Sequence, residues 1–81
     1  MNAQHTLAEL DLEATISAVL QRHAETVAAW QRNEPGSWGA LAGQAVLAVR
    51  RALGRPLTDG ERRQVWQATW NHLTRIRRCT T

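Results

Sequence analysis

The residues that could do chemistry in this 81-residue chain gather in the stretch VWQATWNHLTRIRR, from Val65 to Arg78. Two tryptophans stand four residues apart, and three arginines follow them. Indole rings exposed beside a basic groove form a stacking surface for single-stranded nucleic acid. The same rings on the inner face of a helix would belong to the hydrophobic core. Trp66 and Trp70 share their face with other apolar residues, so we expect both rings to be buried.

Arginines are concentrated in the second half of the chain. Residues 1–34 contain two arginines and five acids, a net charge of −3, whereas residues 35–81 contain eight arginines and two acids, a net charge of +6. Such asymmetry is typical of a protein that contacts a polyanion, and also of helices that pair by charge. Because a GC-rich coding bias would also favour arginine over lysine, the arginine content has a second explanation. We expect phosphate contacts from five arginines clustered around one predicted turn: Arg50, Arg51, Arg55, Arg62 and Arg63.

No set of residues points to catalysis or to metal binding. The three histidines, at positions 5, 23 and 72, lack the spacing of metal ligands. Cys79 is the single cysteine, so it cannot form an internal disulfide, and a terminal tail offers it no rigidly held base. We therefore expect a non-enzymatic protein that has no metal ion or cofactor.

The elements that position these residues are predicted to be helices. Apolar residues recur every three or four positions in three segments, which are separated by glycine- and proline-containing turns near residues 33–37 and 54–58. We predict an all-α fold, a small antiparallel three-helix bundle. The predicted helices cover about residues 11–32, 38–53 and 59–77. The predicted organisation is an N-terminal arm or short helical turn at 1–10, a single helical domain at 11–78 and a frayed tail at 79–81.

Capping residues mark where these helices begin and end. The sequences TLAE (Thr6–Glu9) and TDGE (Thr58–Glu61) both have the spacing of a capping box. Asp11 offers an alternative start for the first helix. The other predicted capping residues are Ser37 as an N-cap, and Asn33 and Gly54 as helix ends.

Trp30 and Trp38 flank the first predicted turn. Trp30 stands at the end of the first predicted helix and Trp38 at the beginning of the second. Aromatic rings placed on both sides of a short turn can pack against each other. We expect these two rings to pack across the turn and to cover one end of the bundle.

The second predicted helix has a strip of small residues opposite its main apolar face. Gly39 and Gly43 stand four residues apart, although glycine inside a helix costs about 1 kcal/mol relative to alanine. Close approach of another helix would offset that cost. The approaching helix belongs either to the same bundle or to a second copy of the chain. In the second case, the predicted interface residues are Ala40, Gly43, Leu47 and Arg51.

These observations lead to two functional hypotheses. The first is a binding module that contacts nucleic acid or a nucleoprotein assembly through the arginine-rich second half of the chain. The alternative is a protein–protein adaptor or inhibitor, a homodimer through the second helix, which does not contact nucleic acid. Because 81 residues bury only a modest core, we expect a homo-oligomer.

The sequence also bears on the compartment. There is no apolar run of the roughly 18 residues that span a bilayer. The N-terminal stretch MNAQHTLAELDLE contains acids and no arginine or lysine, unlike a signal peptide. We expect a cytoplasmic protein that does not contact a membrane.

Overall fold

The computed structural model describes residues 10–79 and confirms the all-α class. Within that range the chain forms no strand. The described residues form four helices: α1 (Leu12–Arg22), α2 (Ala24–Gln31), α3 (Ser37–Leu53) and α4 (Asp59–Cys79). The predicted capping box at residues 6–9, most of the predicted arm and the last two residues of the predicted tail lie outside the described residues.

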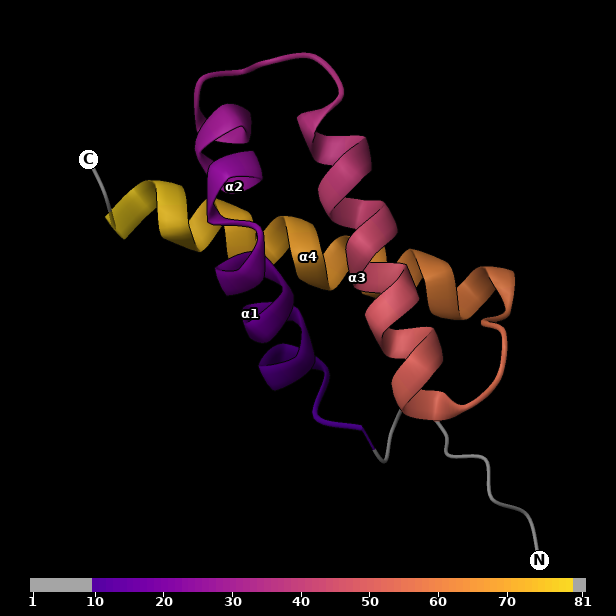
Figure 1. Cartoon of the computed structure of the whole chain (residues 1–81). Helices are drawn as coiled ribbons and strands as arrows, with labels where there is room; N and C mark the ends of the chain where they lie inside the picture. The colour runs from indigo at the N-terminus through magenta and orange to yellow at the C-terminus, as the bar shows by residue number, and fades with distance from the viewer. Residues whose placement is uncertain (1–9, 80–81) are drawn as a thin grey trace, which may run out of the picture.

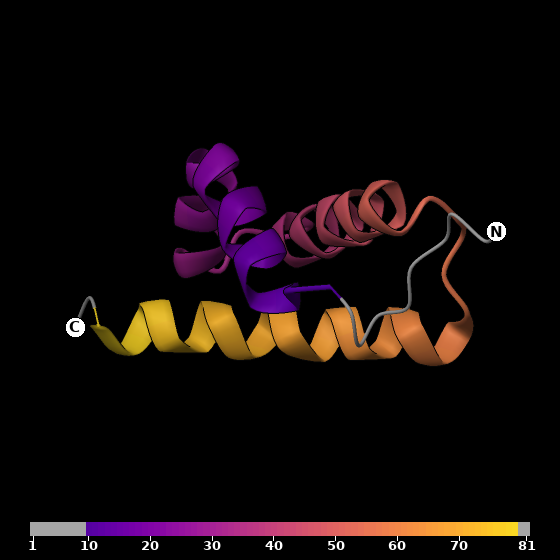
Figure 2. The same cartoon turned by 90° about the horizontal axis from the view of Figure 1, so that it is seen from below.

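The longest helix, α4, runs across the other three. Figure 1 shows α1 and α2 following one another beside α3, with α4 crossing behind them. From below, α1, α2 and α3 all lie on the same side of α4 (Figure 2). The 21 residues of α4 span about 30 Å, so this helix forms a base on which the others pack. The prediction of an antiparallel bundle is therefore wrong for α4, which lies across its neighbours.

The predicted first helix is in fact two helices, so the three-helix prediction was wrong in number. The break falls at His23, whose φ of −115° and ψ of 41° lie outside the helical range. The backbone amide of His23 donates to Val19 O at 3.1 Å, and its carbonyl oxygen accepts from Val27 N at 3.0 Å. No glycine or proline marks the break, so the periodic pattern gave no sign of it. Tertiary packing instead turns α2 toward α3 and α4.

Asn33 ends α2, as predicted. It adopts a left-handed conformation, with φ of 61°. Asn33 N donates to Trp30 O at 2.9 Å and Glu34 N to Ala29 O at 3.0 Å, which together form a Schellman motif. The prediction for Ser37 was wrong, because it is the first residue of α3 and its hydroxyl donates to Glu34 O at 2.7 Å.

The turn between α3 and α4 follows the prediction closely. Gly54 ends α3 with φ of 76°, and its amide donates to Arg50 O at 2.9 Å. Thr58 and Glu61 form the predicted capping box: Glu61 N donates to Thr58 Oγ1 at 3.2 Å, and Thr58 N donates to Glu61 Oε1 at 2.9 Å. At the start of α1, Asp11 is the N-cap and its carboxylate accepts from Ala14 N at 3.0 Å.

A single core lies where α4 meets the other helices. Two adjoining clusters of buried side chains compose it. The first contains Ile16, Leu20, Val27, Trp30, Leu41 and Leu73, and the second contains Ala45, Val49, Leu53 and Val65. Along each segment the ten are spaced by three, four, seven or eight residues, so they follow the apolar periodicity from which the helices were predicted.

Trp66 and Trp70 were predicted to be buried, and this prediction was wrong. Each is 43% exposed. The buried centre of α4 is narrower than its apolar face, and Thr69 occupies it with no exposed surface. The Thr69 hydroxyl donates to Val65 O at 2.7 Å, which satisfies its polar group inside the core. Position on the helix, and not hydrophobicity, thus decides that a threonine is buried and two tryptophans are not.

Candidate nucleic-acid interface

Trp70 is held between two other indole rings. Its ring centroid lies 5.7 Å from that of Trp30 and 5.3 Å from that of Trp38, and both pairs are edge-to-face. Pairs of this geometry contribute roughly 0.5–1.5 kcal/mol beyond the area they bury. The guanidinium of Arg77 lies 4.0 Å from the Trp30 ring centroid. The predicted contact across the first turn is therefore mediated by Trp70, whose ring stays partly exposed.

A groove runs along the surface where α3 meets α4. It consists of two adjacent hollows that share Trp38 and Trp66, with volumes of about 410 and 430 Å³. The first hollow is lined by Trp38, Gly39, Ala42, Gly43, Val46, Arg62 and Trp66, and the second by Trp38, Arg63, Trp66, Gln67 and Trp70. We call their union the tryptophan groove. It combines indole rings, small apolar residues and two cations.

Gly39 and Gly43 leave open space in the wall that α3 contributes to the tryptophan groove. Gly39 and Gly43 are exposed and have ordinary helical backbone angles. A Cβ atom added at either position would meet no neighbouring atom within 4 Å among the described residues. Packing inside the chain therefore does not require glycine at these positions. What the glycines provide is open space beside the exposed rings.

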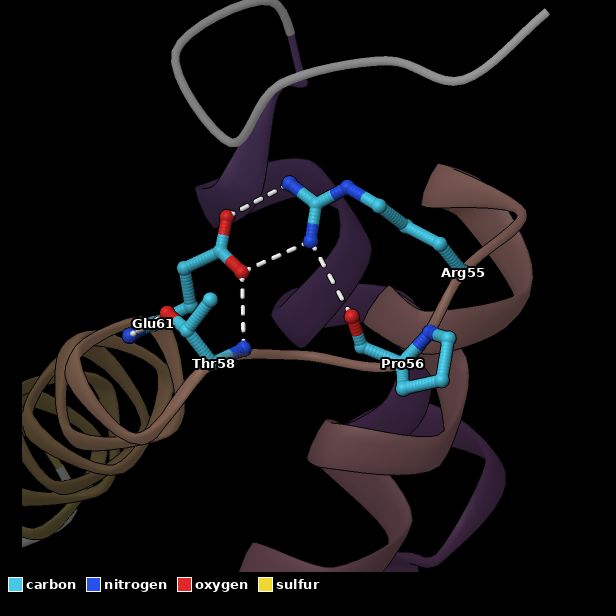
Figure 3. A network of polar contacts seen from close by, with 4 residues as sticks. All are labelled: Arg55, Pro56, Thr58 and Glu61. Carbon is cyan, nitrogen blue, oxygen red and sulfur yellow. Dashed lines mark hydrogen bonds and ion pairs between the residues drawn. The ribbon is translucent and has the colours of Figure 1, made fainter.

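Arg55 stabilises the turn between α3 and α4. Its guanidinium donates two hydrogen bonds of 2.7 Å to the carboxylate of Glu61 and one of 3.0 Å to Pro56 O (Figure 3). Together with the amide of Thr58, this guanidinium lowers the pKa of Glu61 from 4.5 to about 2, because both groups hydrogen-bond the ionised carboxylate. Arg55 is thus engaged within the chain and is less available to a phosphate than the sequence suggested.

The other four arginines of the predicted patch occupy two places. Arg62 and Arg63 lie beside Trp66, where all three line a further small hollow with Asp59. Arg62 is paired with Asp59 at 2.5 Å, and both side chains are largely exposed. Arg63 forms no ion pair within residues 10–79.

Arg50 and Arg51 are exposed at the C-terminal end of α3 and do not line the tryptophan groove. Neither forms an ion pair within the part of the chain that the structure describes. Cations in the last turn of a helix are stabilised by its dipole, which accounts for their presence without any ligand. The structure therefore divides the five predicted arginines into a pair in the groove, a pair at the helix end and one that forms the turn.

The predicted dimer interface is only partly shared with the groove. Ala40, Gly43 and Arg51 are exposed, and Leu47 is half-buried. Of these four residues, Gly43 alone lines the tryptophan groove. The remaining three lie elsewhere on α3, so the two predicted surfaces are neighbours that meet at one residue.

A second groove lies between α4 and the pair α1 and α2. Its volume is about 430 Å³, and it is lined mainly by small and apolar side chains together with His72. Nδ1 of His72 is buried and has no hydrogen-bond partner within the described residues. No group of three or more His, Cys, Asp or Glu residues in the described range could hold a metal ion. Ser17, Gln21 and Gln31 also line this groove, so it combines apolar contacts with a few polar side chains.

The predicted site omitted the aromatic part of the tryptophan groove. Trp66 and Trp70 were assigned to the core, Trp38 was assigned to a contact with Trp30 across the first turn, and Gly39 was noted only for its spacing. One signal in the sequence would have indicated their position. Val65, Thr69 and Leu73 form a straight stripe, and both tryptophans of α4 lie to the same side of it, next to Arg62 and Arg63.

Comparison with known proteins identifies no relative. No family model, no curated protein and no solved structure matches the chain. In the part of the chain that the structure describes, no helix combines the length and the apolar character needed to cross a membrane.

Proposed function

We propose that this protein is a non-enzymatic helical binding module that contacts nucleic acid, alone or in a nucleoprotein assembly. The contact would be made by the exposed arginines of α3 and α4, namely Arg50, Arg51, Arg62 and Arg63. The observation that supports this proposal most directly is the position of Arg62 and Arg63. They line the same hollows as Trp66, an indole ring that is 43% exposed. Cations beside exposed aromatic rings suit a ligand that has both phosphates and flat bases.

Charge supports the same proposal. The second half of the chain has a net charge of +6. Three of the five arginines in the predicted patch, Arg50, Arg51 and Arg63, form no ion pair within residues 10–79. Phosphate contacts by such side chains release counterions, so binding weakens as salt increases.

The proposal is tested by titrating a fluorescently labelled duplex with the protein at low and moderate salt. We expect affinity to fall steeply with salt, and the double variant Arg62→Gln with Arg63→Gln to bind more weakly. The slope of log affinity against log salt should decrease by about 1 for each phosphate contact removed. Arg22→Gln is the matched control, because Arg22 is exposed on α1 and does not line the groove. Equal binding by the double variant and the control would exclude this surface.

The alternative function, a protein–protein adaptor that dimerises through α3, is supported by one observation. Gly43 is exposed, and the packing of the chain does not explain why it is glycine. A helix from a second copy could approach closely there. Light scattering tests this alternative directly. A dimer through α3 should persist at high salt and dissociate in Gly43→Leu, whereas an unchanged mass in that variant would exclude Gly43 from an interface.

A further inference from the structure

We propose that the tryptophan groove binds the bases of a single-stranded nucleic acid, with bases stacked on Trp66 and Trp70 and a phosphate held by Arg63. This inference rests on the proposed nucleic-acid function and specifies the class of ligand. Among the residues that the structure describes, it also gives a role to Trp66 and Trp70, two large apolar side chains that are each 43% exposed.

The spacing of the two rings favours an unstacked strand. Trp66 and Trp70 stand four residues apart on α4, about 6 Å along the helix axis. Stacked nucleotides in a duplex strand rise only about 3.4 Å each. Two rings at the wider spacing can each receive a base from a strand whose bases have separated. A duplex keeps its base faces covered and would offer this surface only its phosphates.

The surroundings of Trp70 prepare its ring for stacking. The edge-to-face contacts with Trp30 and Trp38 hold Trp70 in place before any ligand arrives. Gly39 and Gly43 leave open space in the wall that α3 contributes to the groove. Little side-chain freedom is lost on binding when an aromatic ring is already fixed, which favours affinity.

Charge complementarity selects a nucleic acid over a second copy of this chain. In a two-fold symmetric dimer, each partner presents the same surface to the other. A dimer built on the groove would therefore bring Arg63 of each copy into the same basic interface. Arg63 forms no ion pair within residues 10–79 that would offset this repulsion. A single strand supplies the anions that the groove lacks, together with base faces that can stack on its indole rings.

The test compares an oligothymidine of about 15 nucleotides with a duplex of the same length, using anisotropy of the labelled nucleic acid and quenching of tryptophan fluorescence. Trp66→Ala is the main variant, because no ring contact involves Trp66 within the described residues, whereas Trp70 supports two other rings. Trp66→Phe retains an aromatic face. Gln64→Ala, at an exposed position of α4 outside the groove, is the control.

We expect the single strand to bind more tightly than the duplex and to quench the tryptophan fluorescence. Trp66→Ala should lose roughly tenfold in affinity for the single strand, with little change for the duplex. Trp66→Phe should restore much of that loss, and Gln64→Ala should behave as the wild type. Circular dichroism of each variant establishes that its helices are intact.

The possible failures can be distinguished. Equal binding of duplex and single strand, without quenching and without an effect of Trp66→Ala, would overturn base stacking and leave the phosphate-binding function in place. Binding of neither nucleic acid would overturn both proposals. A dimer in light scattering that Trp66→Ala converts to a monomer would assign the groove to a second copy and overturn the single-strand proposal.

Discussion

At the scale of single residues, Glu61 links the cap of α4 to the preceding turn. Its carboxylate accepts from both terminal nitrogens of Arg55 and from the backbone amide of Thr58. Two paired hydrogen bonds between a guanidinium and a carboxylate fix direction as well as distance. A residue whose type suggests only a helix cap therefore also determines where Arg55 lies, and removes that cation from the predicted phosphate patch.

The lowered pKa of Glu61 predicts a pH-dependent stability. Because this pKa falls from 4.5 to about 2 on folding, the stabilisation is fully present above pH 4.5 and is lost as the pH falls toward 2. Wild type should therefore have a higher Tm than Glu61→Gln at neutral pH, and the difference should shrink through this acidic range. Thermal unfolding followed by circular dichroism measures it. Glu25→Gln, at an exposed site on α2 that forms no ion pair with any residue of the described range, should show no such change. A difference in Tm between wild type and Glu61→Gln that does not change with pH would mean that the charge of Glu61 does not contribute to stability.

At the scale of elements, α3 contains Gly43 and is ended by another glycine, Gly54, and the two have different roles. Gly54 ends α3 in the left-handed region, with φ of 76°, where side chains are disfavoured. Gly43 lies inside the same helix at ordinary angles, with open space beside it. The left-handed backbone conformation at the end of α3 therefore favours glycine at position 54, whereas neither backbone conformation nor packing among the described residues requires glycine at position 43.

Substituting alanine at these two positions should change stability in opposite directions. Gly54→Ala should lower the free energy of unfolding by about 1 kcal/mol, because the added Cβ disfavours the left-handed conformation. Gly43→Ala should raise it by about 1 kcal/mol through helix propensity. For a domain of this size, each change corresponds to roughly 4–8 °C in Tm. Denaturation of both variants at several protein concentrations checks the pair. A destabilised Gly43→Ala would indicate that another chain packs against this position.

At the scale of the whole molecule, four helices share one small core. Leu73 belongs to α4 and packs with residues of α1, α2 and α3 in the same cluster. A chain of 81 residues has a free energy of unfolding of roughly 4–12 kcal/mol in total. The side chain of Leu73 alone thus accounts for a large part of this free energy of unfolding.

Leu73→Ala should lower the free energy of unfolding by about 2–5 kcal/mol, because Leu73 has no exposed surface and its loss leaves a cavity. Urea denaturation followed by circular dichroism and by tryptophan fluorescence measures the change. The two transitions should coincide, since all helices depend on the same core. Gln64→Ala, on the exposed face of α4, should change stability by less than about 0.5 kcal/mol. Separate transitions would indicate that α4 unfolds independently.

The helix class and most helix ends were predictable because they depend on neighbouring residues. Asn33, Gly54 and the Thr58–Glu61 capping box act within a few positions of themselves, so their types and spacing suffice. The break at His23 was not predictable, since no residue nearby disfavours a helix. It exists because α2 must turn to bury Val27 and Trp30 against the other helices.

The all-α class, the C-terminal end of α3, the start of α4 and the inward faces of α1, α2 and α3 could be predicted from the sequence alone, because they follow from local capping and from the 3.6-residue period. Only the tertiary structure decided which half of an apolar face is covered. The way α4 crosses its neighbours leaves Trp66 and Trp70 exposed, and the pairing of Arg55 with Glu61 reduces the predicted basic patch. Both depend on the orientation of one helix relative to another, which side-chain type and spacing along a single helix do not specify.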